Sequence, residues 1–240
     1  MKVTLLDHMG SDLTVVNAAR VSFDKRSEWA HVPKDPSIYG DNGHWGVLGE
    51  KDAKLISYLA KHNHWTPFAH CFAQLRVKVP IFVARQLAKH QVGLVCNEQS
   101  RRYIDDEPEF WFPETWRVRP EGSMKQGSGG EHPASGIWGA AAVMNVASSL
   151  QLYSSMIADG VAPEQARIVL PLNTHTEWYW SGSLAAWARV CKLRLDPHAQ
   201  IETHMIAELI YPEMQELFPV SWAALMEEHS PQLCTEQTPA

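Results

Sequence analysis

The chain contains 240 residues, of which 45% are hydrophobic and 20% are charged, and its formal net charge is −6. These values are ordinary for a globular protein and predict a single domain over residues 1–240. An acidic chain is a poor candidate for broad nucleic-acid binding, because surfaces that bind DNA or RNA are normally basic. No stretch approaches the roughly 18 consecutive apolar residues of a membrane span, so we expect neither nucleic acid nor a membrane as a partner.

The first residues and the cysteines both predict a cytoplasmic protein. The segment MKVTLLDHMGSDL carries one lysine, and Asp7 and His8 interrupt an apolar run that is too short for a secretory signal. The four cysteines lack the CxxC spacing of a zinc or redox site, which fits reduced thiols. For a viral protein, the compartment would be the host cytoplasm.

The first half of the chain predicts both strands and helices. Residues 1–6 alternate as a strand does, and residues 12–23 predict a short helix capped by Asp12. Residues 24–46 predict a loop, and residues 49–64 an amphipathic helix. Residues 70–80 alternate with a period of two and predict a strand, after which Pro80 leads into a helix over residues 81–91.

The second half is mainly helical after an irregular insertion. Residues 105–136 are rich in proline and glycine and predict an insertion with a mobile tip, although its aromatic stretch FWFPETW should pack against the rest. Helices are predicted over residues 138–159, from Pro163, from about Ser183, and from Asp196 to about Leu217. The predicted fold class is α+β, with helices packed against a central antiparallel or mixed sheet.

The segment NEQSRRY, residues 97–103, gathers many hydrogen-bonding groups in a short loop. Glu98 can accept from sugar hydroxyls, and Ser100 can donate to a phosphate. Arg101 or Arg102 can hold an anion with its planar guanidinium. This combination favours a nucleotide-binding loop over a chance polar turn.

Other polar residues leave two interpretations open. Arg85 and Lys89 are four residues apart on the predicted helix, a spacing that is unfavourable for like charges unless an anion or acid lies between them. This face is either solvated or part of a pocket. Arg167 and Arg194 lie within apolar runs, where an arginine forms a structural salt bridge or recognises carbonyl or phosphate oxygens.

Several common chemistries lack their sequence signatures. The histidines show no zinc motif with a third ligand at fixed spacing, so we expect no metal site. Neither GxGxxG nor GxxxxGK[ST] is present, which argues against a Rossmann or P-loop turn. Cys96 has no recognisable base, so a buried structural role is favoured over a nucleophile.

Taken together, these segments resemble the flavin-dependent thymidylate synthases. The family signature is R-H-R, seven further residues and S, and the corresponding run here is PIFVARQLAKHQVGLVCNEQSRRY. Lys89, His90 and Gln91 replace the R-H-R triplet, and eight residues separate Gln91 from Ser100. Supporting blocks are AARVSF at 18–23, HNHWTPFAH at 62–70, ARIVLPLN at 166–173 and LRLDPHAQIE at 193–202. Ser183 and Arg189 occupy positions where the family commonly has asparagine.

The resemblance implies reductive methylation of dUMP to dTMP. Methylenetetrahydrofolate would supply the carbon, reduced FAD the hydride, and NADPH the electrons that reload the flavin. A homotetramer with active sites at subunit interfaces is also implied. The altered triplet leaves one alternative, a nucleotide-binding protein with a degenerate flavin site and no methylation activity. A generic flavin oxidoreductase is a further possibility.

Residue roles follow from the resemblance by position. Arg194 would be catalytic, because a fixed cation beside the uracil carbonyls stabilises negative charge on the ring. The residues that match the family's dUMP site are Gln86, Lys89, Glu98, Ser100, Arg101, Arg102, Arg167 and Arg194. Those that match its flavin site are Ser22, His64, Thr66, Lys89, His90, Gln91, Glu98, Arg189 and His198.

Overall fold

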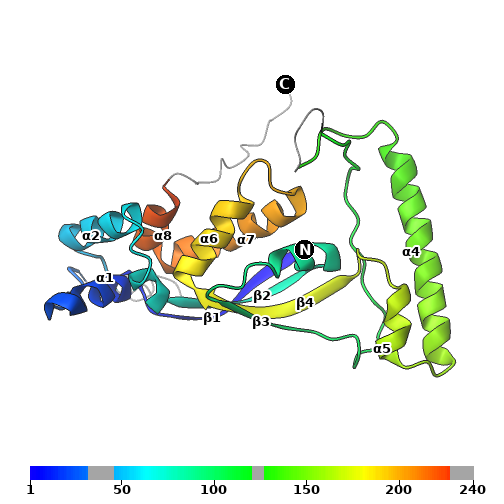
Figure 1. Ribbon diagram of the computed structural model, residues 1–240, viewed down its shortest axis with the longest axis horizontal. Coiled ribbons are helices and arrows are strands. Elements are labelled where there is room, and N and C mark those ends of the chain that lie inside the picture. Colours follow the sequence, from blue (N-terminus) through cyan, green and yellow to red (C-terminus); the bar gives the residue numbers. More distant parts are fainter. Residues whose placement is uncertain (32–45, 121–126, 228–240) are drawn as a thin grey trace.

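The computed structural model describes residues 1–31, 46–120 and 127–227, and a four-stranded antiparallel sheet lies at its centre (Figure 1). The strands are β1 (Lys2–Met9), β2 (Phe72–Pro80), β3 (Leu94–Glu98) and β4 (His175–Ser183), in the spatial order β1-β2-β4-β3. The α-helices are α1 (Asp12–Arg20), α2 (Glu50–Lys61), α3 (Ile81–Leu87), α4 (Ser135–Ala158), α5 (Pro163–Ala166), α6 (Leu184–Arg194), α7 (Ile201–Leu217) and α8 (Pro219–Met226). Short 3-10 turns are η1 (Val21–Phe23), η3 (Pro67–His70) and η4 (Arg167–Val169).

Alternation along β2 divides the sheet into two unlike faces. Its odd-numbered residues, from Ala73 to Val79, are buried under the helical layer. The even-numbered Gln74, Arg76 and Lys78 point to the other side, where their partners on β4 are also polar or exposed. The strand predicted from period two is confirmed, and one face of the sheet is left open to polar interactions.

The core lies between the sheet and helices α6, α7 and α8 (Figure 1). Trp187 of α6 is fully buried, its ring centroid lies 5.0 Å from that of Trp180, and its Nε1 donates to the carbonyl of Gly182 over 3.0 Å. Gly182 must lack a side chain, because a Cβ there would lie 2.3 Å from Leu94 of β3. This close approach lets β3 pair with β4.

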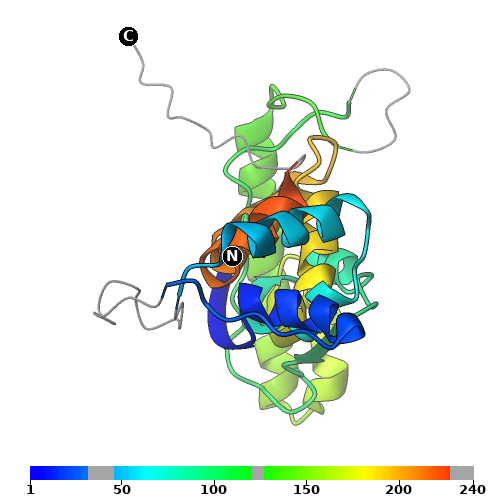
Figure 2. The ribbon, with the colours of Figure 1, turned by 90° about the vertical axis from the view of Figure 1, so that its left-hand side faces the viewer.

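Helices α1, α2 and α8 gather at one end of the sheet, which Figure 2 views end-on. Asp12 was predicted to cap its own helix, and this is wrong, because the N-cap of α1 is Ser11. Instead Asp12 is buried and accepts from the backbone N–H groups of Val220 and Ser221, over 3.0 and 2.8 Å. Its carboxylate therefore satisfies the first turn of α8 from far away in the chain.

Helix α4 extends along the opposite end of the molecule (Figure 1). It is strongly apolar, but of its residues only Ser135, Val146 and Tyr153 are buried. Met144 is 74% exposed and Ile137 is 70% exposed. A helix with this much uncovered apolar surface is typical of one that packs against another chain.

Several predicted boundaries differ from the structure. The helix predicted over 81–91 ends at Leu87, and the last long helix begins at Ile201 and not at Asp196. The predicted loop over 24–46 and the insertion over 105–136 fall partly outside the described residues, at 32–45 and 121–126. The aromatic stretch of the insertion does pack, since the rings of Trp111 and Phe82 lie 5.7 Å apart. No helix in the described residues is long and apolar enough to cross a membrane.

Candidate active site

Arg194 is fixed at the end of α6 by two contacts with the segment around α3. Its Nε donates to Nε2 of His90 over 2.9 Å, and its Nη2 reaches the carbonyl of Gln86 at 3.5 Å. The chain turns after α3, where the N–H of His90 bonds to the carbonyl of Leu87 over 2.9 Å. Because α3 ends at Leu87, the turn that follows it places His90 beside Arg194.

The electrostatics of this cluster keep His90 neutral. Burial, followed by the charges of Arg194 and Arg189, lowers the pKa of His90 to about 4. A neutral imidazole accepts at Nε2, which matches the hydrogen bond from Arg194. Burial also lowers the pKa of Arg194, yet a guanidinium stays protonated at neutral pH. The charge of the cluster is therefore carried by the arginine.

Arg194 faces a cavity of about 620 Å³, called here the Arg194 hollow, whose walls include Gln86, His198, Gln200 and Glu202. The Oε1 atom of Gln86 is buried and has no hydrogen-bond partner in the described residues. A buried acceptor without a partner is costly, and a ligand donor would satisfy it.

A second hollow of about 280 Å³ brings together four residues of the predicted flavin set. Lys89, His90 and Gln91 form one wall, and Arg189 of α6 forms another. Arg189 also donates to the carbonyl of Val92, which ties α6 to the altered triplet. This cavity is called here the triplet hollow. Two cations, Lys89 and Arg189, border it and could bind an anionic group.

A third hollow, of about 1090 Å³, follows the edge strand β3 and is called the β3 groove. His90, Gln91, Glu98 and Arg167 line it, together with apolar side chains that include Trp178, Trp180, Met156 and Ile168. Cys96 also lines the groove and is exposed, so the predicted buried role is wrong. Its position on an edge strand leaves it uncovered.

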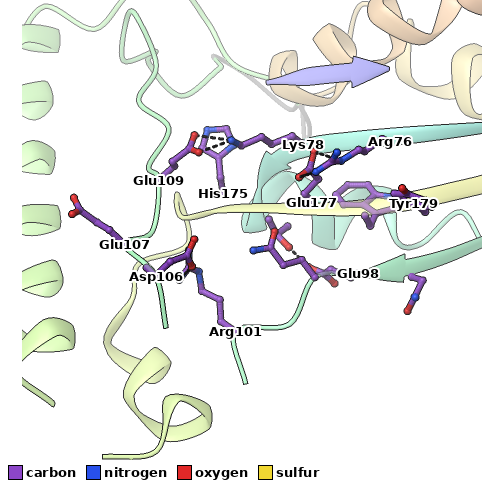
Figure 3. Close-up of a pocket in the computed structure, with 14 residues that line it drawn as sticks. Arg76, Lys78, Glu98, Arg101, Asp106, Glu107, Glu109, His175, Glu177 and Tyr179 are labelled. Atoms are coloured by element: carbon purple, nitrogen blue, oxygen red, sulfur yellow. Dashed lines mark hydrogen bonds and ion pairs between the residues drawn. The ribbon is translucent and has the colours of Figure 1, made fainter. Parts of the chain in front are cut away.

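The open face of the sheet holds a polar hollow of about 610 Å³ (Figure 3). Arg76 pairs with Glu177 over 2.8 Å, and Lys78 pairs with Glu109 over 2.6 Å. Arg101 lies here too, and its Nη1 donates to the carbonyl of Asp106 over 2.9 Å, with the carboxylate 3.5 Å away. Among the predicted anion-binding arginines, Arg101 is thus already neutralised.

The other predicted anion-binding arginines, unlike Arg101, are not paired with a carboxylate among the described residues. Arg102 donates from Nε to the hydroxyl of Ser100 over 3.1 Å and stacks on the ring of Tyr103, 5.0 Å from its centroid. Within the described residues, the guanidinium of Arg167 bonds only to the backbone carbonyl of Glu164, from Nε over 3.2 Å. Within the described residues, no carboxylate lies in salt-bridge range of Arg102, Arg167 or Arg194. These three guanidinium groups keep their charge available to an anion.

Three residues of the predicted flavin set lie apart from these hollows. Ser22 belongs to η1 at the end of α1, and His64 and Thr66 lie between α2 and η3. None of them lines any hollow described above. Within the described residues, these three side chains therefore share none of these hollows with the rest of the predicted flavin set.

Comparisons with known proteins decide the family. The family model described as thymidylate synthase complementing protein matches residues 4–220. The chain belongs to this family. The flavin-dependent thymidylate synthase of Thermus thermophilus is 36% identical over 227 residues, which cover 95% of this chain and 76% of that protein. That of Ehrlichia ruminantium is 34% identical over 228 residues, covering 94% and 70%.

Two solved structures of a UMP/dUMP methylase have the same fold as this chain. The UMP/dUMP methylase PolB from Streptomyces cacaoi, bound with 5-Br dUMP, matches with a TM-score of 0.76 at 29% identity and covers 94% of both chains. Its complex with 5-Br UMP matches with a TM-score of 0.77 at 28% identity and covers 95% of each. The predicted family, the enzyme class and the α+β fold are confirmed.

Sequence reasoning missed one partly buried ion pair at the rim of the Arg194 hollow. Glu202 of α7 is only 4% exposed, and it forms an ion pair with Arg117 of the insertion. Glu202 ends the family-like block LRLDPHAQIE, which was the available signal for its importance. Its partner was not anticipated, because none of the family-like sequence blocks includes Arg117.

Proposed function

We propose that this protein methylates dUMP to dTMP with methylenetetrahydrofolate as carbon donor, using FAD that NADPH reduces. The net reaction transfers one CH₂ unit to dUMP and consumes two hydrogens of reduced FAD, leaving tetrahydrofolate and oxidised FAD. The observation that carries this proposal is the Arg194 cluster, in which a fixed guanidinium lies beside the buried Oε1 of Gln86, an acceptor without a hydrogen-bond partner among the described residues. Family membership supports it independently.

The Arg194 hollow offers the groups that a uracil ring requires. The ring has an N3–H donor between two carbonyl acceptors. The Oε1 atom of Gln86 accepts from N3–H, and the outer nitrogens of Arg194 donate to a neighbouring carbonyl. When hydride adds at C6, negative charge grows on the ring, and Arg194 stabilises that charge without moving.

The phosphate of dUMP is bound by the arginines that lack a carboxylate partner among the described residues. Arg102, with Ser100 beside it, and Arg167 meet this condition. Arg101 meets it less well, because Asp106 competes for its guanidinium. Arg102 lines none of the hollows described above, and we propose that it reaches the phosphate of a nucleotide whose base is held by Arg194 of another subunit.

The triplet hollow and the β3 groove fit a flavin. Lys89 and Arg189 supply cations for a pyrophosphate, and the apolar walls of the groove cover a flat ring. Bound FAD supplies the hydride and accepts electrons from NADPH. Gln91 stands where the family has arginine, so Arg189 and Lys89 carry most of the positive charge here.

An oligomer, which we infer to be the homotetramer of the family, completes the site. The exposed apolar surface of α4 supports a contact with another copy of the chain. A second chain also brings Ser22, His64 and Thr66 to the flavin held by the first. Active sites then form between subunits.

One experiment separates methylation from nucleotide binding alone, the alternative that the altered triplet favours. Purified protein is mixed with FAD, NADPH, methylenetetrahydrofolate and [5-³H]dUMP, and both tritiated water and dTMP are measured. We expect stoichiometric tritium release and dTMP, each dependent on FAD. Binding of dUMP without tritium release would establish the nucleotide-binding alternative, and NADPH oxidation that ignores dUMP would indicate a generic flavin oxidoreductase.

A further inference from the structure

The two consecutive arginines of the segment 97–103 have different surroundings. The side chain of Arg101 is only 14% exposed and lines the polar hollow on the open face of the sheet, called here the sheet-face hollow. Arg102 is exposed, donates to Ser100 and stacks on the ring of Tyr103. It lines none of the hollows described above. The two guanidinium groups are therefore suited to different roles.

Strand β4 holds both ends of the loop that carries these arginines. At one end, the N–H of Gln99 donates to the carbonyl of Glu177 over 2.9 Å. At the other end, the N–H of His175 donates to the carbonyl of Glu109 over 2.8 Å. Because only the ends are bonded to the sheet, residues 100–108 need contacts of their own to keep one conformation.

Arg101 supplies such a contact within the loop. Its Nη1 donates to the backbone carbonyl of Asp106 over 2.9 Å and lies 3.5 Å from the carboxylate of the same residue. Figure 3 shows the side chain of Arg101 extending from one arm of the loop to Asp106 on the other. The hydrogen bond fixes the main chain, and the opposite charges strengthen it. The pair therefore closes the loop.

The charge of the sheet-face hollow is unfavourable for a phosphate. Among the described residues that line it, three are cations and five are carboxylates, an excess of two negative charges. The cations are Arg76, Lys78 and Arg101, and the carboxylates are those of Glu98, Asp106, Glu107, Glu109 and Glu177. Burial, followed by the charges of the N-terminus and Lys78, lowers the pKa of His175, so its imidazole adds no positive charge at neutral pH. A phosphate would be repelled here, whereas an arginine is attracted.

We propose that Arg101 is a positioning residue of the nucleotide-binding loop and not a ligand of the phosphate. By holding Asp106, it keeps residues 100–108 in the conformation that presents Ser100 and Arg102 to the phosphate of dUMP. This inference rests on the proposed function, which assigns those two groups to the phosphate. A loop that samples other conformations binds more weakly, in proportion to the fraction of time that it spends in the competent one.

The competing role for Arg101 is direct contact with the phosphate. Its Nε is buried and has no hydrogen-bond partner among the described residues, so a ligand oxygen could satisfy it. The two roles predict opposite effects of removing the carboxylate of Asp106. If Arg101 positions the loop, the loop loosens and dUMP binds more weakly. If Arg101 binds the phosphate, its guanidinium is freed from a competitor and dUMP binds more tightly.

The first measurement is calorimetric binding of dUMP to the full chain saturated with FAD. Asp106→Ala and, independently, Arg101→Ala should each raise the Kd for dUMP roughly 3- to 10-fold, as for a loop that is competent about a tenth to a third of the time. The double variant should lose no more than the weaker-binding single variant, because both changes remove the same contact. The matched control is Glu107→Ala, which should leave the Kd unchanged. It removes a carboxylate from the same hollow without breaking an ion pair among the described residues.

The second measurement follows the loop in the absence of nucleotide. Hydrogen exchange detected by mass spectrometry should be faster over residues 100–108 in Asp106→Ala and Arg101→Ala than in the wild type or Glu107→Ala. The melting temperature and the flavin affinity should stay at the wild-type values, because the contact is confined to the loop. At saturating dUMP the turnover should recover, so that both variants raise KM and leave kcat nearly constant.

The outcomes separate this inference from the proposed function. Tighter dUMP binding by Asp106→Ala would overturn it and make Arg101 a phosphate ligand. Unchanged loop exchange, dUMP affinity equal to that of Glu107→Ala, or a fall in both melting temperature and flavin affinity would also overturn it, even if the wild type makes dTMP. Weaker dUMP binding with faster loop exchange in both variants supports it even if no dTMP forms, a result that would refute only the methylation proposal.

Discussion

Arg194 and His90 are 104 positions apart in the chain and are joined by a hydrogen bond of 2.9 Å from Nε to Nε2. The bond uses the Nε–H group of the guanidinium and leaves N–H groups on Nη1 and Nη2 for a ligand. It requires an unprotonated imidazole, because a protonated ring has no acceptor. The orientation of the proposed catalytic group therefore depends on the charge state of His90.

This dependence predicts how stability changes with pH. The folded pKa of His90 is about 4, and an unfolded histidine titrates near 6.5. Below the unfolded pKa, the unfolded state binds the proton and the folded state does not. The stabilisation is therefore complete above pH 6.5 and is lost as the pH falls towards 4.

His90→Gln removes this titration. We expect a shallower fall in unfolding free energy between pH 6.5 and 4 than in the wild type, measured by urea denaturation at several pH values. His204→Gln, on the surface of α7, is the control and should keep the wild-type slope. Identical slopes for the wild type and His90→Gln would mean that folding does not change the pKa of His90.

Arg194→Lys tests the proposed charge stabilisation. Lysine keeps a positive charge but lacks the planar fork and the Nε donor that His90 holds. We expect a loss of turnover of about 10²- to 10³-fold, with flavin affinity nearly unchanged. Steady-state dTMP formation and flavin absorbance give the two values, and Arg26→Lys, at an exposed position, is the control. Parallel losses of turnover and flavin affinity would argue for a structural role.

Met144→Asp tests the association surface of α4. Met144 is 74% exposed, and a carboxylate placed in an apolar subunit contact is strongly unfavourable. We expect the mass measured by light scattering to fall below that of the wild type. Ser57→Asp, on exposed α2 surface, should leave the mass unchanged. A variant of wild-type mass would exclude this part of α4 from the interface.

Asp12→Ala tests the link between the first and last helices. The change leaves the N–H groups of Val220 and Ser221 buried and without an acceptor. The expected loss is about 1–3 kcal/mol of unfolding free energy by urea denaturation, and Asp12→Asn, which keeps one oxygen, should lose less. Asp7→Ala, at an exposed position, should change stability by no more than about 0.5 kcal/mol. Equal stabilities for Asp12→Ala and Asp7→Ala would contradict the capping role.

The sequence predicted those helices and strands whose burial pattern can be read from neighbouring residues. The alternation of β2 and the amphipathic pattern of α2 mark surfaces that are buried on one side only. Strand β3 was not predicted, because Leu94–Glu98 is short, largely exposed and held by pairing with β4, which lies far along the chain. Asp12 was misassigned for the same reason, since its partners on α8 lie 208 and 209 positions away.

The candidate site was predictable by residue type more than by arrangement. Gln86, His90 and Arg194 were identified and do meet, whereas Arg101 was identified but pairs with Asp106. A motif shows which side chains are present, but not which neighbours compete for them. The Arg117–Glu202 pair escaped notice because Arg117 lies outside the family-like sequence blocks and its partner lies 85 positions away in the chain.

The most direct test of the account is a single turnover without NADPH. Protein loaded with FAD is photoreduced under anaerobic conditions and mixed with dUMP and methylenetetrahydrofolate, and flavin absorbance and dTMP are followed together. We predict that the flavin is reoxidised as dTMP appears, with one dTMP formed per flavin. Flavin that stays reduced in the presence of both substrates, with no dTMP formed, would contradict the central claim.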